Sequence, residues 1–185
     1  MGERMRKSIQ DSTSRARVHL GRGFSLVELV AVVLLLSIMA AAAVPAVSRA
    51  AEQRAAAGVE LVARDILYAR DSASSSGLGT WLAFDTVQQR YTVYRENRTN
   101  LGRAGRQVAT DPATGLDFIV RFGVGDLSGL TLTAFSAGTG SEIGFDWQGR
   151  PKNQNEAALS SNAVVGLSNG RQIVIDAASG AVSIQ

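Results

Sequence analysis

The chain has 185 residues, a formal net charge of +3 and an apolar fraction of 45%, which leaves room for one domain of ordinary size and an appendage. It contains no cysteine and a single histidine, His19, which excludes disulfides and thiolate metal sites and leaves residues 20–185 without the usual general base and zinc ligand. We therefore expect no enzymatic activity, no cofactor and no metal site.

The basic charge is concentrated at the N-terminus. Residues 1–23 carry six basic and two acidic side chains, a net charge of +4, whereas residues 24–185 carry 13 basic and 14 acidic side chains, a net charge of −1. The basicity of the whole chain therefore comes from this first segment, and it does not by itself indicate binding to nucleic acid.

An apolar segment of 21 residues follows at residues 24–44 and contains one charged side chain, Glu28. As a helix rising about 1.5 Å per residue it would span roughly 31 Å, which matches a bilayer core of about 30 Å. Six basic residues precede it, so the positive-inside rule predicts that residues 1–23 are cytoplasmic and that the chain after residue 50 lies on the far side of the membrane. A secretory signal cleaved near residues 40–46, or an uncut membrane anchor, would both fit this pattern.

Neither of these two interpretations explains Glu28. A charged side chain within an apolar membrane helix costs about 2.5–3.5 kcal/mol on insertion scales and calls for a partner. If a peptidase cut between Gly23 and Phe24, the new α-amino group would lie one helical turn before Glu28. The amine of one subunit could then meet Glu28 of a neighbour that is shifted along the same axis, and this salt bridge would offset the cost of burial.

The stretch RGFSLVEL at residues 22–29 resembles the cleavage and methylation motif of type IV prepilins and type II secretion pseudopilins. The resemblance implies cleavage by a prepilin peptidase after Gly23, N-methylation of Phe24 and subunit assembly through Glu28. Pro45 stands where this family often has a proline. Because proline lacks an amide donor and crowds the preceding turn, we expect a kink or break of the helix there.

The helix is predicted to continue to residue 76, because residues 46–76 are rich in alanine, arginine, glutamate and leucine. Apolar residues recur in it at spacings of three and four, which places them on one face that a sheet must cover. These residues are Val59, Val62, Ile66, Ala69 and Ala73. The small side chains of residues 46–57 would allow close packing of neighbouring subunits in a filament.

From residue 77 the apolar pattern changes to a period of two, which predicts β-strands. The candidate strands are residues 80–85, 90–95, 118–122, 130–135, 142–146, 163–167, 171–176 and 181–184. Asn169-Gly170 predicts a two-residue hairpin turn, and Ser179-Gly180 is a weaker signal of the same kind. A mainly antiparallel sheet with one face on the helix is the simplest arrangement, so the expected fold class is α+β.

Residues 142–185 resemble the C-terminal half of the GspH/FimT group of minor pseudopilins and pilins. The resemblance rests on the segment 144–146, the turn 149–151 and the final strands around residues 179–182, and it implies a pilin-like fold. The expected division is a cleaved leader at 1–23, the transmembrane half of the helix at 24–47, its periplasmic half at 48–76 and a β-rich periplasmic domain at 77–185.

Three arginines, Arg98, Arg103 and Arg106, lie in a segment rich in glycine and asparagine at residues 96–115. They could form a basic patch for DNA or for an acidic partner, or they could belong to a solvated, mobile loop without fixed structure, which is the favoured interpretation. FimT-like pilins are thought to bind DNA through a C-terminal Gly-Arg-x-Arg motif, and here Gly170-Arg171 lacks the second arginine.

These features together predict a minor pseudopilin of a type II secretion system, a structural subunit of an inner-membrane filament that helps drive protein export. The alternatives are a FimT-like minor type IV pilin serving pilus assembly or DNA uptake, and a membrane-anchored binding domain without a filament. The expected partners are a prepilin peptidase, other pseudopilins or pilins, assembly platform proteins and lipid of the bacterial inner membrane. Nucleic acid is the less favoured partner.

Overall fold

The computed structural model describes residues 25–138 and 140–185, and for residues 41–48 it describes the backbone only. The chain divides into two units at residues 43 and 44. The described residues form one α-helix, ten β-strands and two short 3-10 turns. Their bounds are α1 Leu26–Ser76, β1 Thr80–Asp85, β2 Arg90–Arg95, η1 Arg103–Gly105, β3 Gln107–Val108, β4 Ile119–Arg121, η2 Gly125–Leu127, β5 Leu132–Ser136, β6 Glu142–Phe145, β7 Pro151–Asn153, β8 Ala163–Leu167, β9 Gln172–Ile175 and β10 Val182–Ile184.

Helix α1 runs without interruption through Pro45, so a break of the helix, one of the two outcomes expected at this residue, is not observed. A kink there stays a prediction. The helix ends where Gly77 adopts a φ of 70°, a left-handed conformation that glycine reaches without a steric cost. The predicted apolar face is confirmed, because all five of its residues are fully buried.

The strands form two antiparallel sheets, which corrects the prediction of a single sheet. The six-stranded sheet has the order β3-β2-β1-β6-β7, with β4 also paired to β2. The four-stranded sheet has the order β10-β9-β8-β5. The segment between β4 and β5 includes η2 and three glycines with positive φ, at residues 123, 125 and 129, and it lets the chain leave one sheet and enter the other.

All eight predicted strands are present, within two residues at each end, and two short strands were not predicted. The strand β7 begins with Pro151, a residue that has no amide to donate, and β6 is the one named strand with which it pairs, at the edge of the described sheet. The strand β3 has two residues, too few to show an alternating pattern. Edge pairing in the folded chain, and not the sequence pattern, defines both strands.

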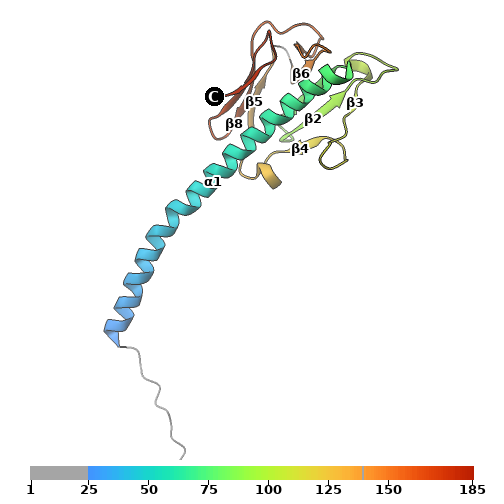
Figure 1. Ribbon diagram of the computed structural model, residues 1–185. Coiled ribbons are helices and arrows are strands. Elements are labelled where there is room, and N and C mark those ends of the chain that lie inside the picture. The colour runs from blue at the N-terminus through green and yellow to red at the C-terminus, as the bar shows by residue number, and fades with distance from the viewer. Residues whose placement is uncertain (1–24, 139) are drawn as a thin grey trace, which may run out of the picture. The chain divides into compact units, whose positions relative to one another are not determined.

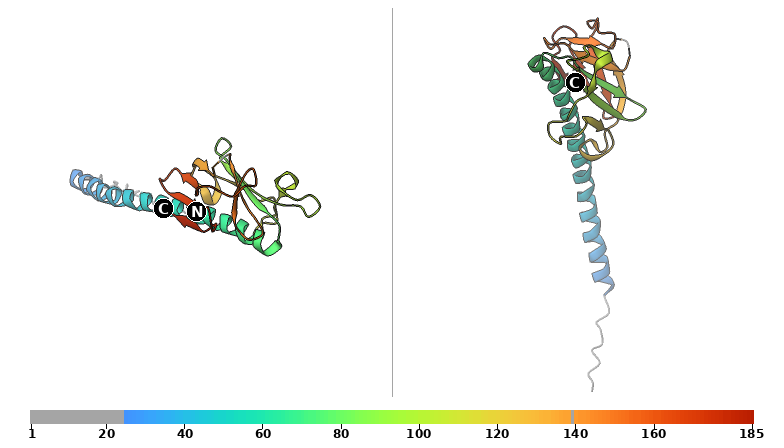
Figure 2. Two further views of the ribbon diagram at one scale, coloured as in Figure 1. Left: turned by 90° about the horizontal axis from the view of Figure 1, so that it is seen from above. Right: turned by 90° about the vertical axis from the view of Figure 1, so that its right-hand side faces the viewer.

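Both sheets pack with the helix around one core. Residues 59–73 of α1, strands β1, β2 and β6 and strands β5, β8 and β9 all contribute to the same buried cluster. In Figures 1 and 2 the green part of α1 lies alongside both groups of strands. The side chain of Gln89 links the sheets, because its amide both donates to and accepts from the backbone of Leu132.

The hairpin between β8 and β9 differs in detail from the prediction. Only Gly170 has positive φ there, at 78°, whereas Asn169 does not. The amide of Leu167 donates to the carbonyl of Arg171, which makes a three-residue loop and not a two-residue turn. A glycine in the left-handed region at the third loop position is typical of this longer hairpin.

Candidate functional site

The residues predicted to direct assembly lie at the start of α1. Gly23 and Phe24 fall outside the described residues, so leader cleavage and N-methylation stay predictions. Glu28 lies in the first turn of α1 and is exposed, without a described ion-pair partner in its own chain. The side chain of Pro45 is also outside the described set.

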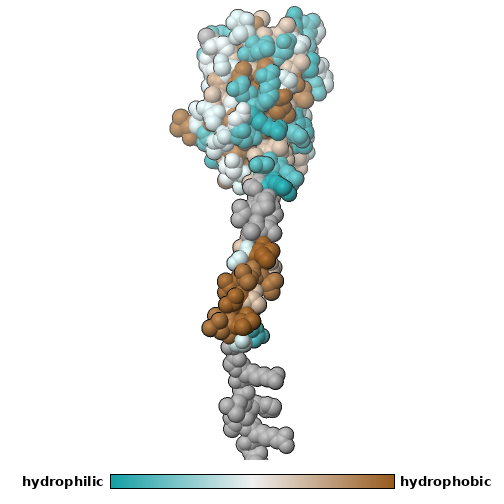
Figure 3. Space-filling model, turned by 90° about the vertical axis from the view of Figure 1, so that its left-hand side faces the viewer, coloured by the Kyte–Doolittle hydropathy of each residue, from teal (hydrophilic) through white to brown (hydrophobic). Residues whose placement is uncertain are grey.

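The N-terminal part of α1 presents its apolar side chains to the surroundings. Eleven large apolar residues between Leu26 and Met39 are 42–78% exposed. Figure 3 shows them as the brown stretch of the helix. Over the part of the chain that the structure describes, no helix meets the length and hydropathy needed to span a bilayer. The predicted span, residues 24–47, lies partly outside the described side chains.

The predicted basic patch is divided by an ion-pair cluster. Glu142, a buried residue of β6, accepts hydrogen bonds from Nε of Arg103 at 2.6 Å and from both terminal nitrogens of Arg106. The guanidinium of Arg106 also lies 4.5 Å from the ring centre of Tyr94, a cation–π contact. Arg98 is exposed and has no part in this cluster.

Glu142 therefore pairs with both guanidiniums, and its single negative charge compensates one of their two positive charges. Burial alone would raise the pKa of Glu142, but the hydrogen bonds and charges of the two arginines outweigh burial and hold this pKa below the ordinary value of 4.5. The carboxylate is ionised at neutral pH, so the three arginines do not act together as a free cationic patch.

Residues 97–106, here called the strap, lie over the outer face of the six-stranded sheet. Besides the Glu142 cluster, Glu96 accepts from the amides of Gly79 and Gly102, and Glu156 accepts from the amide of Arg103 at 2.7 Å. The strap contains η1 and leads directly into β3. The prediction of a loop without fixed structure is wrong for this segment, because long-range acidic partners supply the order that its composition lacks.

Beneath the strap, Trp81 pairs across the sheet with Tyr94 on one side and with Gly144 on the other. Trp81 is 2% exposed, and its indole N–H has no partner among the described residues. A Cβ atom at position 144 would lie 2.3 Å from the Trp81 ring, so only glycine leaves room for the indole. The strap and Gly144 together allow a tryptophan to be buried on the outer face of this sheet.

A buried pair that the sequence did not reveal joins the helix to the sheet. The hydroxyl of Tyr91, on β2, donates to Oδ2 of Asp65, on α1, at 2.6 Å. Burial raises the pKa of Asp65 above its ordinary value of 3.8, although the Tyr91 bond and the charge of Arg64 partly oppose this. Burial, together with the Asp65 charge, also raises the pKa of Tyr91 well above 10, so the phenol keeps its proton. Asp65 is not a position of the predicted apolar face, so no local pattern marked it as buried.

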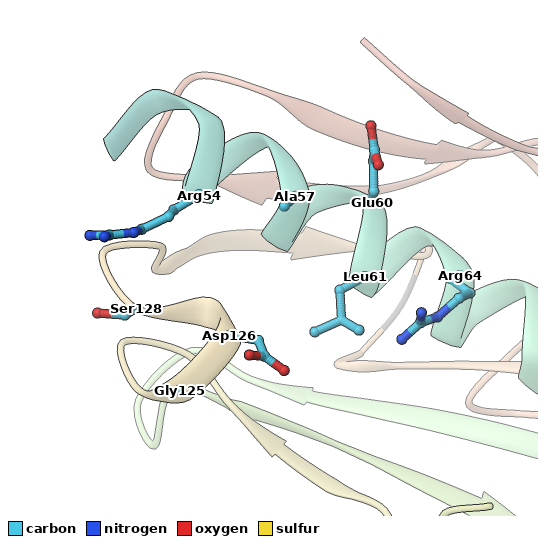
Figure 4. Close-up of a pocket in the computed structure, with 8 residues that line it drawn as sticks. All are labelled: Arg54, Ala57, Glu60, Leu61, Arg64, Gly125, Asp126 and Ser128. Carbon is cyan, nitrogen blue, oxygen red and sulfur yellow. The ribbon is translucent and has the colours of Figure 1, made fainter. Parts of the chain in front are cut away.

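Two adjoining cavities form a trough along one side of α1. The larger, of about 750 Å³, lies between α1 and the η2 loop, and the other, of about 420 Å³, continues toward β4. Leu61, Arg64 and Asp126 line both cavities. Figure 4 shows Leu61 directed into the space between the helix and the loop, whereas Glu60 points away from it. Among the described residues no cluster of histidine, aspartate or glutamate could hold a metal.

No protein-family model matches the chain, and no curated protein matches it. Two solved structures of the minor pseudopilin EpsH from the type II secretion system of Vibrio cholerae are similar in structure. One is 14% identical with a TM-score of 0.49, and the other is 12% identical with a TM-score of 0.50. Each match covers 71% of this chain, and they cover 96% and 93% of the respective EpsH chains. The fold of this chain is therefore similar to that of a type II secretion minor pseudopilin, which agrees with the resemblance seen in its sequence.

Proposed function

We propose that the chain is a minor pseudopilin of a type II secretion system, a structural subunit of a filament anchored in the inner membrane that helps drive protein export across the outer membrane. The observation that carries this proposal is the division of α1. Residues 59–73 bury one face against the chain's own sheets, whereas the apolar side chains from Leu26 to Met39 are left without cover by the chain itself.

An apolar helix of this kind needs an apolar environment. In the proposed cycle, inner-membrane lipid covers it before assembly and the helices of other pseudopilins cover it in the filament. Glu28 is exposed in the first turn, where an amine of a neighbouring subunit can approach it. The proposed partners are therefore a prepilin peptidase, which would free that amine, other pseudopilins, and the platform proteins of the machine.

The geometry of the strap weakens the DNA-uptake alternative. Phosphate binding by arginine needs free guanidinium donors and uncompensated charge. Two of the three candidate arginines instead contact Glu142, and Arg106 also stacks on Tyr94. The proposed role is structural and involves no catalytic step by this chain.

Two substitutions test the proposal in cells. Gly23→Ala should leave the leader attached, which mass spectrometry of the purified chain would detect as an uncut N-terminus. Glu28→Val should permit insertion and cleavage but reduce incorporation into filaments. Glu52→Gln, which removes an exposed carboxylate elsewhere on the same helix, is the matched control and should assemble normally. A wild-type chain that begins at Met1, or normal assembly of Glu28→Val, would contradict the proposal.

A further inference from the structure

The strap lies on the six-stranded sheet without burying a side chain of its own. Its ten residues, 97–106, are all described and none of them is buried. Its one large apolar side chain, Leu101, is 65% exposed. Burial of apolar surface is the main force that fixes a segment to a protein core, and the strap lacks it. Its position therefore depends on polar contacts.

Carboxylates outside the strap supply these contacts. Glu142 accepts three hydrogen bonds from the side chains of Arg103 and Arg106. Glu96 and Glu156 each accept one bond from a strap amide. Of these three acids Glu142 is the buried one, and hydrogen bonds between charged partners are about twice as strong as those between neutral groups. Glu142 is therefore the main attachment point of the strap.

The two ends of the strap meet at one place. Strands β2 and β3 are antiparallel, and Arg95 pairs with Gln107, so the strap is the loop of a β2–β3 hairpin. The strap also has hydrogen bonds of its own, such as the bond from the amide of Gly105 to the carbonyl of Gly102. A compact loop with adjoining ends can leave the sheet as a unit, because neither the β2–β3 pairing nor its internal turns need to break.

The closed strap also leaves a buried donor without a partner. Arg106 contacts both Tyr94 on β2 and Glu142 on β6, so its guanidinium crosses β1, the strand between them, on the face that carries Trp81. The indole N–H of Trp81 has no partner among the described residues. Such a donor is unfavourable, and water would satisfy it once the strap lifts. This gain offsets part of the cost of breaking the ion pairs.

We propose that the strap opens and closes as a unit on a folded sheet, and that its ion pairs with Glu142 hold it closed. Opening exposes Trp81 and releases Arg103 and Arg106 from their acidic partner. The strap therefore controls whether this face of the sheet is covered or presents an aromatic side chain and free guanidiniums. The opening is a property of the β-rich domain, and it requires neither the leader cut nor Glu28.

The first test uses the unmodified full-length chain in detergent. The amides of Gly102 and Arg103 are the reporters, because they donate to the carboxylates of Glu96 and Glu156. Hydrogen exchange followed by mass spectrometry should show these amides exchanging well before those of β1, which pairs with strands on both sides. Strap amides that exchange only together with the amides of β1 would overturn the proposal.

The second test removes the charge of the main attachment point. Glu142→Gln should accelerate exchange at the amides of Gly102 and Arg103 by about 100-fold, because a buried ion pair loses one partner. Glu142 accepts from neither of these amides, so a faster exchange there reports movement of the whole strap. The matched control is Glu60→Gln, which removes an exposed carboxylate of α1 and should change neither rate.

Fluorescence reports the exposure of Trp81 in the same variants. Trp147, which is 61% exposed, is first replaced by phenylalanine, so that Trp81 becomes the single tryptophan. Glu142→Gln should then make Trp81 accessible to acrylamide and shift its emission to longer wavelength, while circular dichroism keeps the signal of the folded sheet. A Trp81 that stays protected from acrylamide would overturn the proposal. Loss of the sheet signal together with exposure of Trp81 would also overturn it, because the strap and the sheet would then unfold together.

Discussion

Replacing Glu142 by glutamine should clearly lower the Tm of the β-rich domain. The substitution keeps the size of the side chain but removes the negative charge that Arg103 and Arg106 share. One of the two guanidiniums would then face an amide NH₂ group, which cannot accept a hydrogen bond. Loss of one partner from a buried ion pair costs about 3–5 kcal/mol. We expect about 3 kcal/mol here, because Arg103 is 37% exposed and water can solvate it in part.

For a unit of about 140 residues, this loss corresponds to a fall in Tm of roughly 10 °C. Thermal unfolding of the full-length chain in detergent, followed by circular dichroism, would measure it. Arg103→Ala is the control, because an exposed partner should cost only about 1 kcal/mol and lower Tm by roughly 3 °C. A Tm for Glu142→Gln within 3 °C of the wild type, or an equal fall for Arg103→Ala, would show that the cluster does not hold the strap.

Three further predictions concern single side chains. The Asp65→Asn variant should gain stability relative to the wild type as pH rises from 3.8 through the raised pKa of Asp65, because the native wild type favours the protonated acid. Denaturant unfolding at several pH values would measure this. A difference in unfolding free energy between variant and wild type that does not change with pH would contradict the prediction. Tyr91→Phe should cost about 1–3 kcal/mol at pH 7 by leaving that carboxylate unpaired, and the cost should shrink in acid. Gly144→Ala should lower the free energy of unfolding by about 1–3 kcal/mol, because the new methyl group clashes with Trp81, and it should shift the tryptophan fluorescence. The control Gly170→Ala should lower the free energy of unfolding by about 1 kcal/mol and leave the fluorescence unchanged.

Local patterns predicted the regular elements well. Strands β1, β2 and β8 have the predicted ends, because each is a short stretch of five or six residues that is rich in apolar, aromatic or β-branched side chains. The helix face from Val59 to Ala73 followed in the same way from its period. The resemblance at residues 22–29 rests on one contiguous stretch of the sequence, so it can be recognised without knowledge of the fold.

The pairings between distant residues were not predictable from the sequence. Glu142 lies 39 residues from Arg103 and 36 from Arg106, and Tyr91 lies 26 from Asp65. No local pattern records such a distance, so the strap was misinterpreted as a mobile loop. The division into two sheets was missed for the same reason, because the residues of a strand indicate that it is a strand but not which strand it will pair with.

The sequence by itself determined the long helix and the candidate strands, and it supplied the resemblance at residues 22–29, because each of these depends on residues that are close neighbours in the chain. Only the tertiary structure decided which charges are free and which are balanced, where a tryptophan is buried and where one is exposed, and which cavity lies beside the helix. These properties depend on contacts between segments that are far apart in the sequence, and solvent exposure and electrostatic pairing exist only once those contacts have formed.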